Sequence, residues 1–113
     1  MDIKINIYYN DKNLKESKEI MYDEKINRDE SKNFKKVFNQ RVIILLNSKN
    51  SNAYKKIGKT VYRYAYSKLY DEFKISSYHD IKKCDFEKAI KFAKNFEIND
   101  ESLKNKINEL NNS

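Results

Sequence analysis

Two side chains in this sequence belong to the types that bind transition metals or act as strong nucleophiles. They are His79 and Cys84, the one histidine and the one cysteine among 113 residues. Asp80 and Asp85 follow them directly, so a zinc site could be drawn from these four side chains. Zinc sites usually need four well-spaced cysteine or histidine ligands, and this chain offers two. The sequence therefore predicts no metal and no cofactor. We expect His79 to be exposed in a connecting segment and Cys84 to behave as a small apolar residue.

Catalysis needs several reactive side chains held together in a cleft, and the sequence does not predict such a set of residues. A nucleophile pair of Cys84 and His79 would lack a third residue to orient the histidine and a loop to bind an oxyanion. Adjacent acidic residues do occur, but neighbours on a helix point about 100° apart, so they do not form an acid–base pair. The one glycine, Gly58, is too few for a glycine-rich phosphate loop. We expect a protein that is not an enzyme.

The residues best suited to binding a partner lie in segment 51–75, which has the longest helical periodicity in the chain. One stripe of this helix is apolar and should face the core, and a second carries tyrosines at every fourth position beside lysine and arginine. Tyrosine and arginine are favoured at protein interfaces, and interleaved lysine and tyrosine can also hold phosphates and stack bases. The predicted partner-binding residues are Lys55, Lys59, Arg63, Tyr62, Tyr64, Tyr66 and Tyr70.

Three interpretations of the tyrosine stripe stay open. Tyr62, Tyr66 and Tyr70 could pack beneath the first and third helices with their hydroxyls at the rim, form a protein interface, or form a nucleic-acid face. Tyr64 lies between the two stripes, and we expect it to be the most exposed tyrosine of the segment. Gly58 either lets another backbone approach closely or is tolerated at a cost of about 1 kcal/mol relative to alanine.

Positive charge is concentrated in the middle of the sequence. The chain has a formal net charge of +7, whereas residues 34–96 contain 15 basic and 5 acidic side chains, a difference of +10. Such a segment attracts polyanions, although a lysine excess also follows from AT-rich codons. The single cysteine, and the lack of an apolar run long enough for a membrane span, suit a soluble protein of the host cytoplasm. We expect no contact with a membrane.

The first 33 residues are predicted to form a separate N-terminal element. Apolar residues alternate from Ile3 to Tyr9, which is the spacing of a strand, and Lys18–Asp23 could return beside it. The segment should therefore be a β-hairpin or an extended arm, with a helix over residues 13–25 as the alternative. Residues 34–113 should form one helical domain.

The rest of the chain is predicted to be a bundle of three to four helices, which makes the fold mainly α. The first helix spans residues 29–47 and ends in five consecutive apolar residues, Val42–Leu46, which a buried strand would also show. If this turn is helical, it must be covered by the chain itself or by a second copy, and a homodimer through Val42–Leu46 then follows. The second helix begins at an N-cap formed by Ser51 or Asn52.

Two shorter helices should follow. We expect Asp85 to cap the third helix and the last helix to begin at Asn99. Tyr78 and Ile81, between the second and third helices, should point inward, and residues 111–113 should be frayed. The predicted core positions are Phe86, Ala89, Ile90, Ala93 and Phe96 in the third helix, and Leu103, Ile107 and Leu110 in the last.

A series of short motifs runs through residues 38–96. They are Phe38–Val42 before a polar break, Ala53-Tyr54 at the start of the long helix, Tyr62 and Tyr70 within it, Ser76-Ser77-Tyr78 after Phe73 and Ile75, Asp80-Ile81, Asp85–Ile90 and the closing Phe96. In this arrangement the segment resembles the small C-terminal domain of phage-encoded antirepressor proteins. Two positions differ from that family, because Lys74 stands where glycine is usual and Phe96 where tryptophan is usual. The resemblance implies a phage or mobile-element origin, a helical fold and action by binding.

These features favour a non-catalytic interaction protein encoded by a phage or mobile element. It would bind a host or phage protein with a regulatory or defence role and inhibit it, as an antirepressor or an anti-CRISPR inhibitor does. The alternative is a basic nucleic-acid-binding protein that uses the lysine- and tyrosine-rich central helix. A third hypothesis is self-association through Val42–Leu46.

Overall fold

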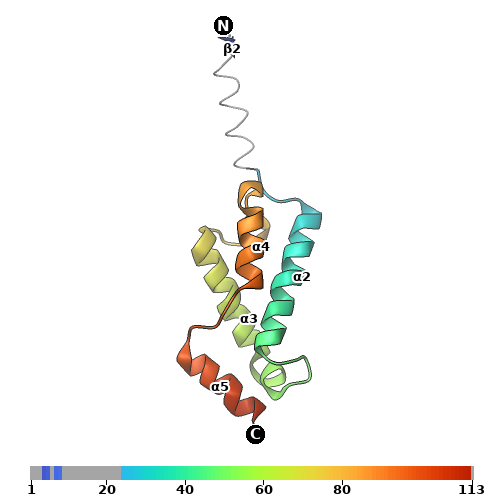
Figure 1. Ribbon diagram of the computed structural model, residues 1–113, viewed down its shortest axis with the longest axis vertical. Coiled ribbons are helices and arrows are strands. Elements are labelled where there is room, and N and C mark those ends of the chain that lie inside the picture. The colour runs from blue at the N-terminus through green and yellow to red at the C-terminus, as the bar shows by residue number, and fades with distance from the viewer. Residues whose placement is uncertain (1–3, 6, 9–23, 113) are drawn as a thin grey trace.

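Helices make up most of the structure, which confirms the mainly α fold expected from the sequence. The computed structural model describes residues 4–5, 7–8 and 24–112. Its helices are α2 (Arg28–Leu45), α3 (Asn52–Phe73), α4 (Phe86–Lys94) and α5 (Glu101–Asn111), with 3₁₀ turns at Tyr78–Asp80 and Lys83–Asp85 (Figure 1). Within the described residues, no helix is both long enough and apolar enough to cross a membrane.

Two strands of two residues each lie near the N-terminus. They are β1 (Lys4–Ile5) and β2 (Ile7–Tyr8), which pair in parallel. The hairpin expected from the sequence depends on a return strand at residues 18–23, which lies outside the described residues. Most of the alternative helix over residues 13–25 lies outside them as well.

Helix α2 begins with a reciprocal cap that the sequence analysis did not identify. The Asn27 side chain accepts a hydrogen bond from the Glu30 backbone N–H at 2.8 Å, and the Glu30 carboxylate accepts one from the Asn27 N–H at 2.8 Å. This capping box satisfies two backbone donors that the first helical turn leaves free. The hydrogen bond from Asn27 also lowers the pKa of Glu30.

The helical domain begins before residue 34. Helix α2 passes through residues 33 and 34 without a break, and Ile26 and Ser31 are buried, with 7% and 4% of their surfaces exposed. The segment ahead of α2 also pairs with the connector between α3 and α4. Ile26 N–H donates to the Ile81 carbonyl and Lys83 N–H donates to the Glu24 carbonyl, both at 2.8 Å. Residues 24–33 are therefore part of the helical domain.

The apolar run at the end of α2 is helical as far as Leu45 and is capped by Leu46, so the strand alternative for Val42–Leu46 is wrong. Val42 and Leu46 are fully buried in the core of the chain itself, and Ile44 is 63% exposed. Because two of the five residues already pack internally, a dimer contact at this turn would depend mainly on Ile44. The homodimer stays a prediction.

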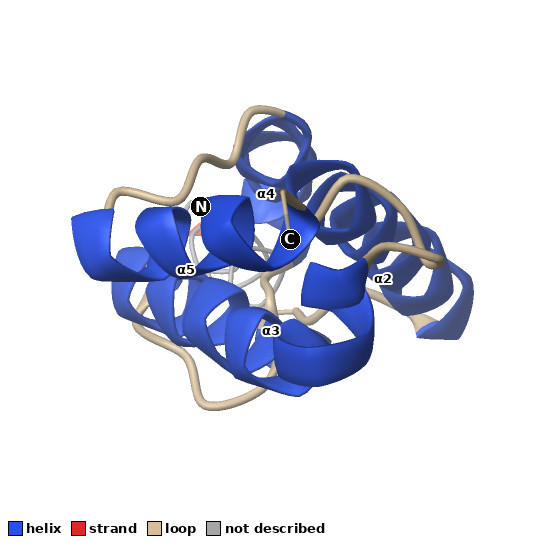
Figure 2. Ribbon diagram, turned by 90° about the horizontal axis from the view of Figure 1, so that it is seen from below, coloured by secondary structure: helices blue, strands red, loops and turns tan. Residues whose placement is uncertain are grey.

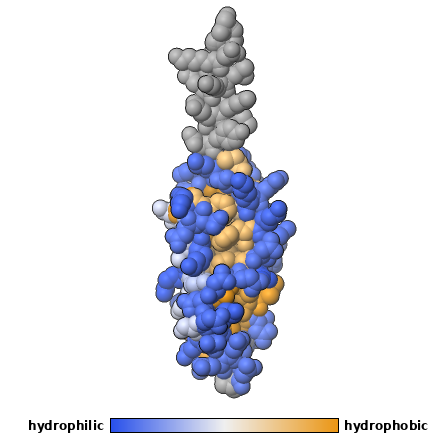
Figure 3. All heavy atoms as spheres, turned by 60° about the vertical axis from the view of Figure 1, so that its left-hand side comes forward, coloured by the Kyte–Doolittle hydropathy of each residue, from blue (hydrophilic) through white to orange (hydrophobic). Residues whose placement is uncertain are grey.

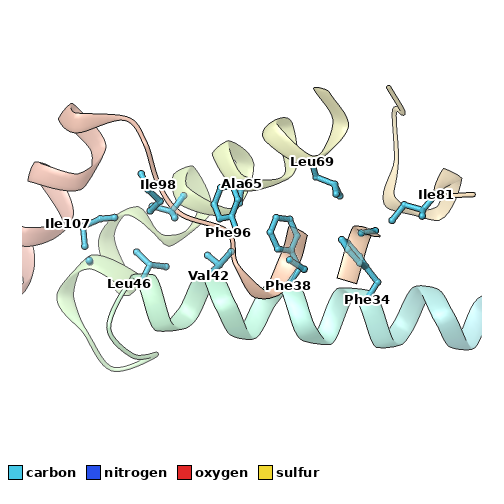
Figure 4. Packing of buried hydrophobic residues seen from close by; sticks show 14 of the residues in the cluster. Phe34, Phe38, Val42, Leu46, Ala65, Leu69, Ile81, Phe96, Ile98 and Ile107 are labelled. Atoms are coloured by element: carbon cyan, nitrogen blue, oxygen red, sulfur yellow. The ribbon is translucent and has the colours of Figure 1, made fainter. Parts of the chain in front are cut away.

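The core lies where α2, α3 and α4 meet. In Figure 4, apolar side chains at every fourth position of α2 point toward the other helices. The fully buried apolar residues of the three helices are Phe34, Phe38, Val42, Ala53, Val61, Ala65, Leu69, Ala89 and Ala93. Phe38 is central among them, because its ring centroid lies 4.9 Å from that of Tyr66 and 5.5 Å from that of Phe96.

The connector and α4 follow the expected pattern, except that the side chain at the cap makes no capping bond. Ile81 is 1% exposed, and the half-buried Tyr78 stacks on Phe34 with ring centroids 6.3 Å apart. Asp85, however, makes no side-chain hydrogen bond to the first turn of α4, and its backbone is already helical (φ −99°, ψ −1°). Asp85 is therefore the N-cap residue of α4 by position, as predicted, but its side chain does not cap the helix because the 3₁₀ turn Lys83–Asp85 leads directly into it.

Helix α5 lies across one end of α3 (Figures 1 and 2). Its N-cap is Asp100, whose carboxylate accepts a hydrogen bond from Leu103 N–H at 3.0 Å, so the helix begins later than Asn99. Ile107 is buried and Leu110 is half-buried against the core, as predicted for this stripe. The stripe is therefore used within the chain.

The end of α5 is fastened by the side chain of Asn111. Its Nδ2 donates to the Leu46 carbonyl at 3.0 Å, and its Oδ1 accepts from the Ala53 N–H at 2.9 Å. Asn52 adds a hydrogen bond from its Nδ2 to the Leu110 carbonyl at 3.2 Å. These bonds join α5 to the end of α2 and the start of α3. The prediction of fraying at residue 111 is therefore wrong.

Helix α3 starts at the predicted N-cap, because Ser51 Oγ accepts a hydrogen bond from Tyr54 N–H at 3.1 Å. The helix is kinked at Ile57, which has φ −130° and ψ 17°. A Cβ placed on the adjacent Gly58 would lie 3.9 Å from the Tyr54 ring. Among the described residues no other helix approaches Gly58 closely, which favours the interpretation that the glycine is tolerated.

The residue that ends α3 explains one departure from the antirepressor-like pattern. Lys74 has φ 57° and ψ 49°, the left-handed conformation that glycine adopts most easily. Its N–H donates to the Tyr70 carbonyl and closes the last turn. A glycine is therefore the residue best suited to this position, and lysine adopts the same conformation at an energetic cost.

Candidate functional site

Three exposed cations of the predicted site lie along one side of α3. Lys55, Lys59 and Arg63 follow one another at intervals of four residues, so their charges are neighbours on the helix surface. No ion pair joins any of them to another described residue. Their positive charge is therefore not neutralised by the described part of the chain.

Three tyrosines separate these cations from α2. The Tyr66 hydroxyl donates to Asn39 Oδ1 at 2.8 Å, and the Tyr62 hydroxyl makes a longer hydrogen bond of 3.5 Å to the Asn39 carbonyl. Tyr70 follows one turn later, with its ring centroid 6.1 Å from that of Tyr66. All three side chains are half-buried, and this burial raises the pKa of each hydroxyl, most strongly for Tyr66. The stripe packs against α2 and reaches the surface at its edge.

Tyr64 lies on the opposite side of α3 and does not join the other predicted residues. Its hydroxyl accepts a hydrogen bond from Asn99 N–H at 3.1 Å, and its ring centroid lies 6.2 Å from that of Phe96. Lys68 Nζ lies 5.4 Å from the centre of the Tyr64 ring. Tyr64 is half-buried, as the other tyrosines of α3 are, and it holds the segment between α4 and α5 against α3. The expectation that it is the most exposed tyrosine of the segment stays a prediction.

A hollow of about 550 Å³ opens beside the kink of α3 and contains part of the predicted site. Its lining includes four lysines and no carboxylate. The polar and aromatic side chains around it are Lys49, Lys55, Lys56, Lys59, Thr60, Tyr54 and Tyr62. The hollow lies near the N-terminal end of α3, where the helix dipole adds partial positive charge. Its chemistry suits a carboxylate or a phosphate.

Helix α2 adds a second row of cations that the sequence analysis did not include. Arg28, Lys32 and Lys36 are exposed and also follow at intervals of four residues. Asn39, less than one turn beyond Lys36, is the residue that accepts hydrogen bonds from the α3 tyrosines, so the row lies on the side of α2 next to them. Their regular spacing could have revealed the row from the sequence, but its position beside α3 depends on packing.

A second hollow, of about 380 Å³, opens at the start of α2. Arg28, Lys32 and Lys35 line it together with Tyr78 and His79, whose ring centroids lie 4.1 Å apart. This hollow also has no carboxylate in its lining. Basic hollows therefore occur near the start of each of the two long helices.

Comparison with known families shows where the chain belongs. A family model described as the ORF6C domain matches residues 6–107. The chain is a member of the ORF6C domain family. ORF6C domains are found in phage antirepressor-like proteins, so this is a phage-associated domain. No curated protein and no solved structure matches the chain.

The ORF6C match extends on both sides of the segment, residues 38–96, in which the resemblance to antirepressor proteins was seen. It includes the start of α2 and most of α5. Both rows of cations and both basic hollows therefore lie within the ORF6C domain.

The two residues with metal-binding or nucleophilic side chains are not gathered into a site. His79 is exposed, as expected, and lies against Tyr78. Cys84 is exposed, so the expectation that it behaves as a small apolar residue is wrong. In the described part of this ORF6C domain, no three histidine, cysteine or acidic side chains lie close enough together to hold a metal ion.

The other side of α3, which faces α4 and α5, has a different character. Figure 3 shows a band of apolar surface along the helical domain, bordered by hydrophilic side chains. The groove between α3 and α4 contains Phe92 and Phe96 together with the acidic residues Asp71, Glu72 and Glu97. The ORF6C domain therefore carries, on its α2–α3 side, cations that form no ion pair with a described residue, and carboxylates in its α3–α4 groove.

Proposed function

We propose that this ORF6C domain is a non-catalytic binding module that docks on an acidic surface of a regulatory or host-defence protein and inhibits that protein. The observation that carries the proposal is the row Lys55, Lys59 and Arg63, exposed and without a counter-charge among the described residues. The occurrence of the family in phage antirepressor-like proteins supports a partner with a regulatory or defence role.

The energetics of α3 also support a partner with negative charge. Like charges at intervals of four residues destabilise a helix by about 0.2–0.5 kcal/mol per pair. Lys59 forms two such pairs, with Lys55 and with Arg63. A partner that places carboxylates beside this row would remove the repulsion and would also attract the domain over a distance, which raises the association rate. The half-buried tyrosines beside the row offer the amphipathic contact area that protein interfaces use.

The experiment that tests the proposal is capture from a nuclease-treated bacterial lysate. The tagged domain should retain one protein in stoichiometric amount, and the retention should survive the nuclease. The isolated partner should then lose its own activity when one equivalent of the domain is added. Loss of all retained protein after nuclease treatment would contradict the proposal.

Nucleic acid is the second candidate partner, and the lysine-lined hollow at the kink of α3 is the observation that favours it. If six or more phosphates were contacted, the affinity would fall by orders of magnitude between about 50 and 200 mM salt. The tyrosines favour this candidate less. The rings of Tyr62 and Tyr66 are half-buried against α2, which limits the ring faces that remain for base stacking.

A further inference from the structure

Exposed cations of α2 and of α3 lie on either side of the tyrosines that join these two helices, which extends the proposed site beyond α3. We name this extended site the α2–α3 face, and its residues are Arg28, Lys32, Lys36, Lys55, Lys59 and Arg63. We infer that this face binds an elongated acidic segment of a partner protein, namely an acidic α-helix that lies along the junction of α2 and α3 and reaches both of its ends. The inference rests on the proposed function and names the kind of surface that the partner must present.

The junction between the two helices is lined by tyrosines from end to end. Tyr62 and Tyr66 bond to Asn39 near the middle of α2. The ring centroid of Tyr66 lies 6.1 Å from that of Tyr70 and 6.0 Å from that of Tyr78, so the line of tyrosines continues to both. Tyr78 lines the basic hollow at the start of α2, and Tyr62 lines the basic hollow at the start of α3. The two hollows are therefore the two ends of a single surface.

The length of this surface fits a helix. From Arg28 to Asn39 the rise along α2 is about 17 Å, at 1.5 Å per residue. Tyr62 and Tyr66 both bond to Asn39, and from the midpoint between them back to Lys55 the rise along α3 is about 14 Å. The cations are thus spread over about 30 Å, which is the length of a helix of about 20 residues. Each row lies toward the start of its own helix, so a partner must carry acidic residues at both ends to meet both rows.

Charge on this surface is available for a partner. The six cations of the α2–α3 face are exposed, and none forms an ion pair with a described residue. The carboxylate of Asp80, close to Tyr70, is already paired with Lys25 at 3.0 Å. Ile43, one turn beyond Asn39 on α2, is half-buried and adds an apolar contact between the two rows. Alternating charge and partly exposed apolar groups suit a protein helix better than a bare phosphate backbone.

Three variants with equal changes in net charge test the inference. The first reverses the α2 row (Arg28→Glu, Lys32→Glu, Lys36→Glu), and the second reverses the α3 row (Lys55→Glu, Lys59→Glu, Arg63→Glu). The control reverses Lys88, Lys91 and Lys94 of α4 to glutamate, since these lysines are exposed and lie outside the face. The probe is a fluorescent helical peptide of 20 residues built from glutamate and alanine, and its binding is followed by anisotropy at 150 mM salt. Circular dichroism confirms that each variant is folded.

We expect each row variant to weaken peptide binding by about tenfold or more relative to the control. If only the α3 variant weakens it, the inference is overturned and the proposed function stands. If the α3 variant binds the peptide as tightly as the control does, the inference and the proposed function are both overturned. Equal weakening by all three variants would show an effect of net charge alone and would overturn the inference. Tighter binding of a single-stranded DNA of ten nucleotides, lost in the same two variants, would assign the face to nucleic acid and overturn it as well.

Discussion

At the scale of single residues, one amide side chain connects the last helix to the rest of the fold. Asn111 bonds to both the Leu46 carbonyl and the Ala53 N–H. We predict that Asn111→Ala lowers the free energy of unfolding by about 1–3 kcal/mol, because a partly buried donor loses its partner. Urea denaturation measures the loss. The control is Asn112→Ala, which changes an exposed neighbour and should leave stability nearly unchanged. Equal effects of the two changes would contradict the role given to Asn111.

The left-handed residue Lys74 gives a prediction in the opposite direction. For a residue other than glycine, this conformation costs about 1–2 kcal/mol in the folded state. Glycine avoids that strain, but its greater conformational freedom in the unfolded chain offsets part of the stabilisation. Lys74→Gly should therefore raise the free energy of unfolding by about 0.5–1 kcal/mol. Lys74→Ala, which removes the charge but keeps a Cβ, should give no such gain in the same urea experiment. A loss of stability in Lys74→Gly would contradict this account of the cap.

Tyr66 should make the fold sensitive to alkaline pH. Burial raises the pKa of its hydroxyl above the value in the unfolded chain. Below about pH 10 both states hold the proton and no linkage arises, whereas above it the unfolded chain loses its proton first, so stability falls as the pH rises. The slope for one such group is up to about 1.4 kcal/mol per pH unit. Urea denaturation between pH 9 and 11 should show a steeper fall for the native protein than for Tyr66→Phe. Parallel curves would contradict the prediction.

At the scale of elements, repulsion within the cationic row of α3 should lower the stability of the helix, whereas the same charges should favour binding of an acidic partner. Lys59→Glu changes two repulsive pairs, with Lys55 and Arg63, into attractive ones. It should raise the free energy of unfolding by about 0.5–1.5 kcal/mol and weaken partner binding. Lys59→Gln only removes the repulsion, so it should give about half of that stabilisation. Thermal denaturation of the three proteins at low salt measures the order, and a destabilised Lys59→Glu would show that the row is not under repulsion.

Local patterns predicted the elements that depend on local interactions. The helical spacing of apolar residues predicted three to four helices, and Ser51 was correctly proposed, with Asn52 as the alternative, as the N-cap of α3. Asp85 was also correctly placed as the N-cap residue of α4, but the lack of a side-chain cap there was not predicted, because the preceding 3₁₀ turn had no clear signal in the sequence. The start of the helical domain was placed too late, because the hydrogen bonds of Glu24 and Ile26 join segments more than 50 residues apart. Such contacts leave no periodic pattern.

At the scale of the whole molecule, the site was predicted only in part for the same reason. The exposed row of α3 was found from spacing alone. The α2 row was missed because its place beside α3 depends on how the two helices pack, which Asn39 and the tyrosines determine. The hydrogen bond between the Tyr64 hydroxyl and Asn99 was not predicted, because only the path of the chain after α4 brings Asn99 there. When two helices share a binding site, the sequence can reveal the exposed row on each helix. It does not show that the two rows lie side by side, because that depends on packing.

The central claim is that the domain acts through the cations of the α2–α3 face, and one measurement tests it most directly. The tagged native protein, the α3-row variant and the α4 control are used in parallel to capture protein from the same nuclease-treated bacterial lysate. We predict that the native protein and the control retain the same stoichiometric partner and that the α3-row variant loses it. Retention of that partner by the α3-row variant at the native level would contradict the claim.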